Sequence, residues 1–271
     1  MSENIIEEVK ISLFVPSIRY KKTITLTILD NEDDRVISYA IFVIQGYQGD
    51  PKYGEEKAED FKGIDEDGLG KLNILTSEDT KVYIYASSTS QNTKSKVINE
   101  IKKQKKINKN VKIVMVGHSM GADNIVELTK ENRDIIFDLI ILLDIKDASS
   151  YGVFSIDDDD INDNVKNVIN YYQEGEKFGI GGEKVEIINS QKTKGTNILS
   201  PGSNHRSIDN DLKDYIIEDI RNFKNGKDVV KMANERKLPN FDPNDSKSKA
   251  IDISPHSSYN NIKNNHEEIF T

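Results

Sequence analysis

The pentapeptide at residues 117–121 (GHSMG) constrains the fold of this chain more than any other feature of the sequence. Residues 111–116 (VKIVMV) precede it with the apolar, β-branched composition of a buried strand, and residues 121–130 are typical of a helix. A serine in such a sharp strand-to-helix turn has a strained backbone, and large side chains two residues away would collide with the strand and the helix. The pattern therefore predicts that the Ser119 hydroxyl stands above a sheet.

The segments on either side of this turn alternate between strand and helix patterns. Strands are predicted at residues 9–15, 23–29, 36–44, 81–85, 139–145, 165–172 and 196–199, and further helices at 92–106 and 209–223. The continuous apolar run at 41–44 (IFVI) suits a strand that is buried on both faces of a parallel sheet. We therefore expect an α/β fold with a mostly parallel, twisted sheet and helices on both faces, in which the first two strands form an antiparallel edge.

The composition changes near residue 238. Beyond it, proline, serine, asparagine, aspartate and lysine dominate and the apolar runs stop. A length of 271 residues accommodates one α/β domain of this kind. We expect one domain over residues 1–238 and a polar C-terminal tail, poorly ordered or peripheral, over residues 239–271, whose protein partner the sequence does not indicate.

Charge and composition exclude several classes of protein. A net charge of −9 repels phosphate backbones, so nucleic-acid binding is not expected. The chain has no cysteine, which excludes disulfides, thiolate metal sites and a cysteine nucleophile. The N-terminus lacks the pattern of a signal peptide, and the apolar stretch at 135–145 contains Asp138 and Asp144 and is too short to span a membrane. A cytoplasmic protein is the default expectation, and export without a signal peptide is compatible with the sequence.

Two short motifs resemble ligand sites but lack required residues. The glycine-containing segment at 68–71 (GLGK) is followed by Leu72 where a phosphate-binding loop needs serine or threonine. The acidic run at 157–160 lacks the glycine of a calcium-binding loop and is interpreted as a solvated segment. We therefore expect no metal ion and no organic cofactor.

A serine hydroxyl is a weak nucleophile at neutral pH and needs a base, for which the chain offers four histidines. His118 is adjacent to the serine and points the wrong way, and His266 lies in the polar tail. His205 lies between a predicted last strand and an amphipathic helix, where the core would fix its position. His205 is therefore the predicted base, and His256 is the alternative.

Several acidic residues could orient the imidazole of such a base. Asp144 ends the apolar strand that follows the helix after Ser119, which would place it at the same edge of the sheet as the serine. It is the predicted acid. Asp147, Glu174 and Glu176 are the alternatives, since each follows a predicted strand closely.

Stabilisation of an oxyanion needs two converging donors. The backbone N–H of Met120 lies at the start of the helix after the serine and is the first. The strand at 36–44 runs into residues 45–49 (QGYQG), where glycine permits close approach of the backbone to a substrate. The N–H of Tyr47 is the predicted second donor.

These residues resemble the α/β-hydrolase superfamily, and in particular its lipase-like branch. That branch has G-H-S-x-G around the serine, as residues 117–121 do. It also has a His-Gly-aromatic segment after the third strand, where this chain has residues 45–47 (QGY). It places its acid in a Leu-Asp-Pro segment on the strand that follows the serine turn and its helix, where this chain has residues 143–145 (LDI). The resemblance covers about residues 36–225, with Gln45 and Ile145 as departures.

The resemblance and the residues together imply a serine hydrolase of esterase or lipase type. In this reading Ser119 is the nucleophile, His205 the base and Asp144 the acid, acting on a small-molecule or lipid ester. Amide or thioester hydrolysis at the same site is an alternative, and so is a catalytically silent scaffold that serves as a binding module.

Overall fold

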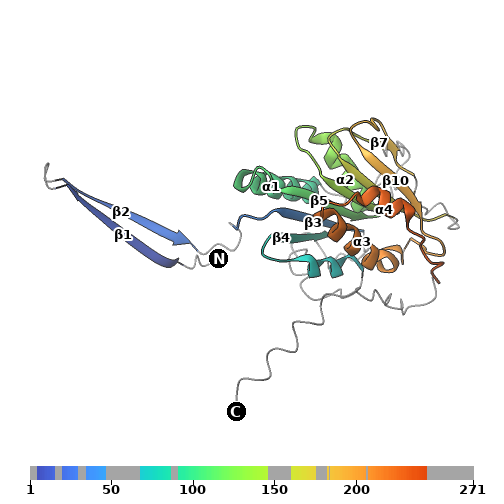
Figure 1. Cartoon of the computed structure of the whole chain (residues 1–271), viewed down its shortest axis with the longest axis horizontal. Coiled ribbons are helices and arrows are strands. Elements are labelled where there is room, and N and C mark those ends of the chain that lie inside the picture. Colours follow the sequence, from blue (N-terminus) through green and yellow to red (C-terminus); the bar gives the residue numbers. More distant parts are fainter. Residues whose placement is uncertain are drawn as a thin grey trace, which may run out of the picture.

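A parallel sheet of six strands forms the centre of the chain (Figure 1). The computed structural model describes residues 5–15, 20–29, 35–46, 68–86, 91–145, 160–174, 182, 184–205 and 207–242. The strand order is β10-β8-β6-β5-β3-β4, and every neighbouring pair is parallel. The strands are β3 (Tyr39–Gln45), β4 (Thr80–Ala86), β5 (Lys112–His118), β6 (Leu139–Leu143), β8 (Asn167–Tyr172) and β10 (Lys194–Leu199).

Helices cover both faces of this sheet, as the sequence predicts (Figure 1). On one face lie α1 (Gln91–Ile107) and α2 (Met120–Glu131). On the other lie the 3₁₀ helix η5 (Gly68–Leu75), α3 (Ile208–Lys224) and α4 (Val229–Glu235). The predicted α/β architecture is confirmed. None of the helices in the described ranges is long and apolar enough to cross a membrane.

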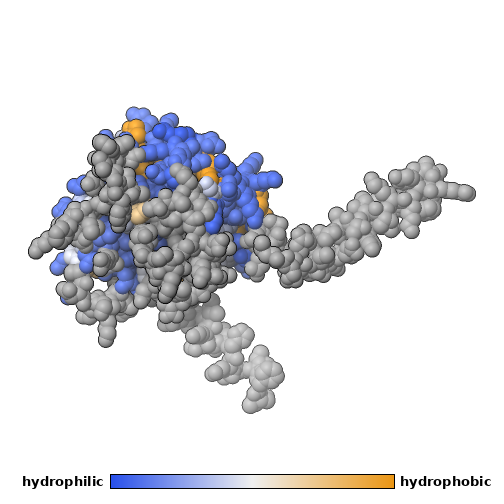
Figure 2. Space-filling view, turned by 180° about the vertical axis from the view of Figure 1, so that it is seen from behind, coloured by the Kyte–Doolittle hydropathy of each residue, from blue (hydrophilic) through white to orange (hydrophobic). Residues whose placement is uncertain are grey.

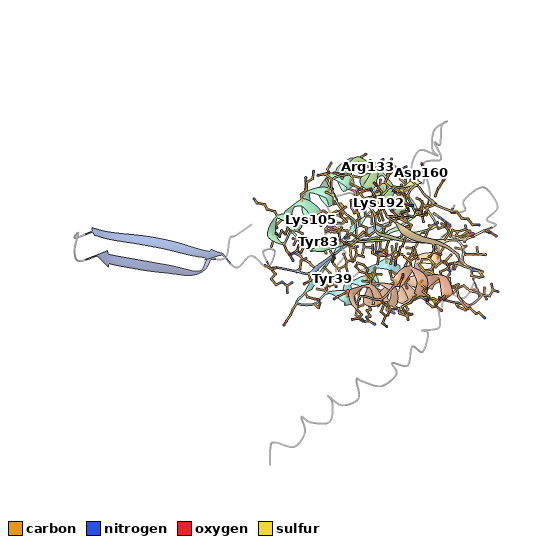
Figure 3. All side chains as sticks on the ribbon, turned by 45° about the horizontal axis from the view of Figure 1, so that its top comes forward. Tyr39, Tyr83, Lys105, Arg133, Asp160 and Lys192 are labelled. Carbon is orange, nitrogen blue, oxygen red and sulfur yellow. The ribbon has the colours of Figure 1, made fainter. Side chains whose placement is uncertain are left out.

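Two hydrophobic cores lie on either side of the sheet because successive side chains of a strand point to opposite faces. Phe42 packs into the core beneath α1 and α2, and its neighbours Ile41 and Val43 pack into the core beneath α3 and α4. Tyr83 on the edge strand β4, labelled in Figure 3, extends the first core toward that edge. Its ring stacks on Phe42, with centroids 4.9 Å apart. The apolar run at 41–44 is thus buried on both faces.

The outer surface of the described residues is largely hydrophilic. Figure 2 shows one face, on which the apolar spots are small and separate. The large hydrophobic side chains that remain exposed are scattered along the chain: Val36, Ile74, Ile136, Ile188 and Leu199. Among the residues whose burial the structure describes, most large apolar side chains therefore lie in the two cores.

Some elements differ from the prediction. The first two strands, β1 (Ile5–Val15) and β2 (Tyr20–Leu29), pair antiparallel as expected, but with each other in a separate two-stranded sheet. The prediction that they form an edge of the main sheet is therefore wrong for the described structure. A second small sheet consists of β7 (Asp160–Ile161) and β9 (Glu186–Ile187). The sequence did not predict these two strands or the helix α4, because each is too short to leave a clear pattern.

A buried polar network joins α3, the end of α4 and β8. The Tyr171 hydroxyl donates to Asp219 over 2.6 Å, and the Arg236 guanidinium donates to Asp219 over 2.6 Å and to the Tyr171 oxygen over 2.9 Å. Burial raises the pKa of Tyr171 well above its ordinary value, so the phenol keeps the proton that it donates. Asp219 is fully buried, and Arg236 is its countercharge.

We expect Arg236→Met to lower the free energy of unfolding by about 3 kcal/mol, because it leaves the buried Asp219 carboxylate without a countercharge. Urea denaturation measures the change. The matched control is Lys231→Met, on α4, which removes an exposed pair with Glu235 at 3.8 Å and should cost less than about 1 kcal/mol. Equal effects of the two substitutions would contradict this account of the network.

Candidate active site

Ser119 lies in the turn between β5 and α2 and has an unusual backbone conformation. Its φ of 55° and ψ of −127° fall in a region that residues with a side chain rarely adopt. The turn is fixed on both sides: the Ser119 N–H donates to the Leu143 carbonyl over 2.9 Å, and the Ser119 carbonyl accepts from Ala122 over 2.9 Å. The sharp turn that the sequence predicts is therefore present, and neighbouring elements hold it in place.

The two glycines of the turn stand where no side chain fits. A Cβ atom on Gly121 would lie 2.1 Å from the carbonyl oxygen of Ile44 on β3. A Cβ atom on Gly117 would lie 2.6 Å from the carbonyl oxygen of Gly121. The start of α2 therefore packs against the backbone of β3 at a distance that only glycine allows.

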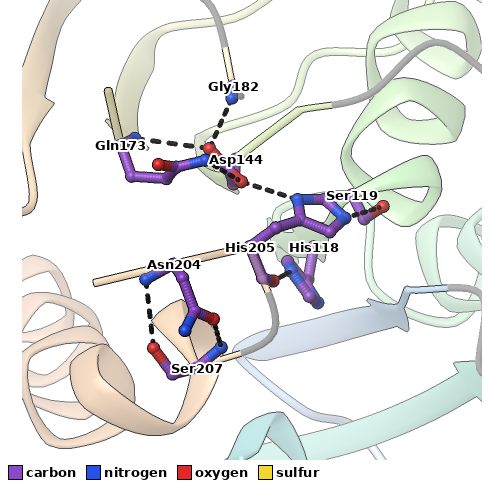
Figure 4. A network of polar contacts seen from close by, with 8 residues as sticks. All are labelled: His118, Ser119, Asp144, Gln173, Gly182, Asn204, His205 and Ser207. Atoms are coloured by element: carbon purple, nitrogen blue, oxygen red, sulfur yellow. Dashed lines mark hydrogen bonds and ion pairs between the residues drawn. The ribbon is translucent and has the colours of Figure 1, made fainter. Parts of the chain in front are cut away.

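The structure brings Ser119, His205 and Asp144 into one chain of hydrogen bonds (Figure 4). The distance from Ser119 Oγ to His205 Nε2 is 2.9 Å, and that from His205 Nδ1 to Asp144 Oδ2 is 2.6 Å. A carboxylate only accepts, so His205 Nδ1 carries a proton, and in the neutral ring Nε2 accepts from the serine hydroxyl. This orientation prepares Nε2 to take a proton from Ser119.

Asp144 is fully buried, and backbone donors surround it. Its Oδ1 atom accepts from the N–H of Gly182 over 2.6 Å and from the N–H of Gln173 over 3.3 Å. Its Oδ2 atom accepts from the Gln173 side chain over 3.4 Å as well as from His205. These donors compensate the cost of burying a negative charge and fix the carboxylate toward the imidazole.

The competing acids do not share this position in the described structure. Glu174 is exposed at the end of β8. Asp147 and Glu176 lie outside the described residues. Among the predicted acids that the structure describes, only Asp144 contacts His205.

The loop that carries His205 has its own hydrogen-bond network, which the sequence did not reveal. Asp211, in the first turn of α3, accepts from the hydroxyls of Ser203 and Ser207, each over 2.8 Å. Asn204 and Ser207 exchange two further bonds: the Asn204 N–H donates to Ser207 Oγ over 3.1 Å and the Ser207 N–H donates to Asn204 Oδ1 over 3.0 Å (Figure 4). These bonds fix the backbone on both sides of His205.

The first residues of the predicted tail support the same loop. The Phe241 N–H donates to the Pro201 carbonyl over 2.9 Å, and the Phe241 ring packs against Tyr215 on α3. The rest of the tail, residues 243–271 with His256 and His266, lies outside the described residues. The domain division at residue 238 and the exclusion of His256 therefore stay predictions.

His118 has a contact that the sequence analysis missed. Its Nε2 atom lies 2.8 Å from the backbone carbonyl oxygen of His205, and the two rings are 5.1 Å apart between centroids. The Ser119 hydroxyl is bonded instead to the ring of His205. Burial lowers the pKa of the His118 imidazole below its ordinary value, so the neutral ring is favoured.

The predicted oxyanion donors are described in part. Met120 is the first residue of α2, where a backbone N–H has no acceptor within the helix, and it follows Ser119 directly. Gly46, the residue after β3, lies beside the turn, since a Cβ atom there would lie 3.2 Å from Ser119 Cβ. Tyr47 lies outside the described residues, so the second donor stays a prediction. Within the described ranges no cluster of three or more histidine or acidic side chains could hold a metal ion.

Comparison with known proteins gives structural neighbours only. No protein-family model matches the chain, and no curated protein matches its sequence. The chain is similar in structure to Est1E from Butyrivibrio proteoclasticus, with 13% identity, 80% of this chain and 98% of that chain covered, and a TM-score of 0.42. It is also similar to a CIB-like hydrolase from Thermoplasma acidophilum, with 12% identity, coverage of 80% and 100%, and a TM-score of 0.37.

A third neighbour is SrfTE, a thioesterase domain that cyclizes the lipopeptide antibiotic surfactin. It is 13% identical, with 71% of this chain and 94% of that chain covered and a TM-score of 0.39. Because these similarities are low, the function has to be argued from the geometry of the chain's own residues.

We expect Gly121→Ala to lower the free energy of unfolding by about 3 kcal/mol, since the added methyl would overlap the Ile44 carbonyl and push α2 away from β3. Thermal or urea unfolding measures this loss. In the control Gly226→Ala, φ is +71° but nothing lies within 4 Å of the added Cβ, so only a backbone cost of about 1 kcal/mol applies. A Gly121→Ala protein as stable as Gly226→Ala would show that the close approach is not required.

Proposed function

We propose that this chain, which has the α/β-hydrolase fold, is a serine hydrolase that cleaves a carboxylic ester through an acyl-enzyme on Ser119. The observation that carries the proposal is the unbroken chain of hydrogen bonds from Ser119 Oγ through the His205 ring to Asp144. A nucleophile, a base and an orienting acid within hydrogen-bond distance are the arrangement that activates a serine hydroxyl.

In the proposed reaction, Ser119 Oγ attacks the acyl carbonyl while His205 Nε2 takes its proton. The carbonyl oxygen becomes an oxyanion, which accepts from the Met120 N–H and from the proposed second donor, the Tyr47 N–H. His205 then gives the proton to the leaving alcohol, and the acyl group remains on Ser119. A water molecule repeats the sequence and releases the acid, so the steps need no metal ion or organic cofactor.

Asp144 has two roles in this scheme. It accepts from His205 Nδ1, which keeps the lone pair of Nε2 directed at the serine, and its negative charge stabilises the imidazolium that forms during attack. The backbone donors at Gly182 and Gln173 fix the orientation of the carboxylate toward the imidazole.

Amide or thioester cleavage would use the same groups in the same order. We propose an ester because residues 117–121 resemble the motif of the lipase-like branch. A catalytically silent scaffold is the alternative outside enzymes. The short bond between His205 and the buried Asp144 argues against it, because a binding module has no need to keep a buried carboxylate aligned with an imidazole. We propose a small-molecule or lipid ester as the substrate.

Hydrolysis of a short-chain p-nitrophenyl ester tests this proposal. We expect Ser119→Ala and His205→Ala each to lower kcat by at least about 10³-fold, since the nucleophile and the base act as one unit. The double variant should be little worse than either single variant for the same reason. Wild-type protein that folds but hydrolyses no activated ester, thioester or amide would favour the silent scaffold.

Asp144→Asn should lower kcat by roughly 10⁴-fold, because an amide at this position favours the wrong imidazole tautomer. The matched control is Glu174→Gln, which makes the same acid-to-amide change at an exposed position and should leave kcat within about twofold of wild type. Steady-state kinetics on the same ester separates the two. Loss of activity in Glu174→Gln with Asp144→Asn near wild type would refute the assignment.

A further inference from the structure

We infer that His118 is a positioning residue. Its Nε2–H group donates to the backbone carbonyl of His205 and thereby keeps His205 Nε2 within hydrogen-bond distance of Ser119 Oγ. The inference rests on the proposed function for its kinetic part and on geometry for the rest. The two atoms that it joins, His118 Nε2 and the His205 carbonyl oxygen, are 2.8 Å apart (Figure 4).

The direction of this hydrogen bond follows from its partners. A carbonyl oxygen only accepts, so His118 Nε2 must carry the proton. In the neutral ring, Nδ1 then has none. That atom faces the end of β3, because a Cβ atom added to Gly46 would lie 3.0 Å from it. The His118 ring therefore stands between the end of β3 and the loop that carries the base.

This bond differs from the others that fix the His205 loop. Asp211 and the pair of Asn204 and Ser207 tie the loop to α3 and to itself. The His118 bond instead ties the loop to the residue that precedes the nucleophile in the chain. A shift of the turn therefore moves the His205 backbone with it, and the distance from Ser119 Oγ to His205 Nε2 is kept.

The position of His118 leaves the Ser119 hydroxyl to His205, since Ser119 Oγ bonds to His205 Nε2 while His118 Nε2 donates to the His205 carbonyl. It also explains why the ring should remain neutral. His205 gains a positive charge during the proposed attack, and its ring centroid is 5.1 Å from that of His118. A charge on both rings would oppose the proton transfer. A neutral imidazole supplies the donor without that repulsion.

Three substitutions separate the donor from the bulk of the ring. His118→Gln keeps an N–H donor at a similar reach, His118→Leu keeps the bulk without a donor, and His118→Asn keeps an amide that is too short to reach the carbonyl. Because small displacements of a catalytic group are costly, we expect His118→Leu and His118→Asn to lower kcat by about 10- to 100-fold with KM within about threefold of wild type. His118→Gln should recover kcat to within a few-fold.

A second readout does not depend on turnover. The proton between His205 Nδ1 and Asp144 should give a low-field signal in the proton NMR spectrum, since it lies in a 2.6 Å hydrogen bond. We expect the signal in wild type, Ser119→Ala and His118→Gln, and its loss or broadening in His118→Leu and His118→Asn. If His118→Leu does not fold, His118→Asn provides the same contrast with His118→Gln.

Two results would overturn the inference. One is an unchanged signal with kcat within twofold of wild type in both His118→Leu and His118→Asn, and the other is a His118→Gln variant as impaired as His118→Leu in a protein of equal thermal stability. The second would show that the shape of the imidazole matters and its donor does not. Failure of the proposed function is distinguishable, because wild type would then lack ester turnover while the NMR comparison among the His118 variants still decides the positioning role.

Discussion

The close packing of α2 against β3 is the contact on which the rest of the site depends. Gly121 lies directly against the Ile44 carbonyl, and this lets the helix begin at Met120, one residue after Ser119. The serine is then held at a positive φ, with its N–H bound to the end of β6. Contacts from β3, β6 and α2 therefore maintain the strained conformation of Ser119. In this conformation the hydroxyl stands above the sheet, next to the positive end of the α2 dipole.

The parallel sheet then assembles the other two members of the site. Ser119, Asp144 and His205 follow β5, β6 and β10, and parallel strands end at the same edge. Asp144 follows the strand adjacent to β5, so it needs no long loop. His205 follows β10, which is separated from β5 by β8 and β6, so its loop must reach across two strands to meet Ser119. The bonds to Asp211, the contact with Phe241 and the bond from His118 lie on this longer loop, where support is needed.

The parts of this arrangement that the sequence predicts are those with a local pattern. The strand–turn–helix around Ser119, the apolar strands and the helix after His205 all leave such patterns, and Asp144 is marked by ending an apolar run. The donors around Asp144 leave none, because Gly182 and Gln173 act through backbone N–H groups that every residue except proline has. The contact of His118 leaves no local pattern either, because its partner is 87 positions away in the chain. Strand patterns likewise do not specify which strands share a sheet, and β1 and β2 pair with each other apart from the main sheet.

The central claim is that Ser119 is an activated nucleophile, and labelling with a fluorophosphonate tests it most directly. The probe forms a covalent bond only with a serine that a neighbouring base activates. The folded wild-type protein, digested and analysed by mass spectrometry, should carry one phosphonyl group, on the peptide that contains Ser119, and Ser119→Ala should carry none. Absence of the adduct in folded wild type, or an adduct on another residue that persists in Ser119→Ala, would contradict the account.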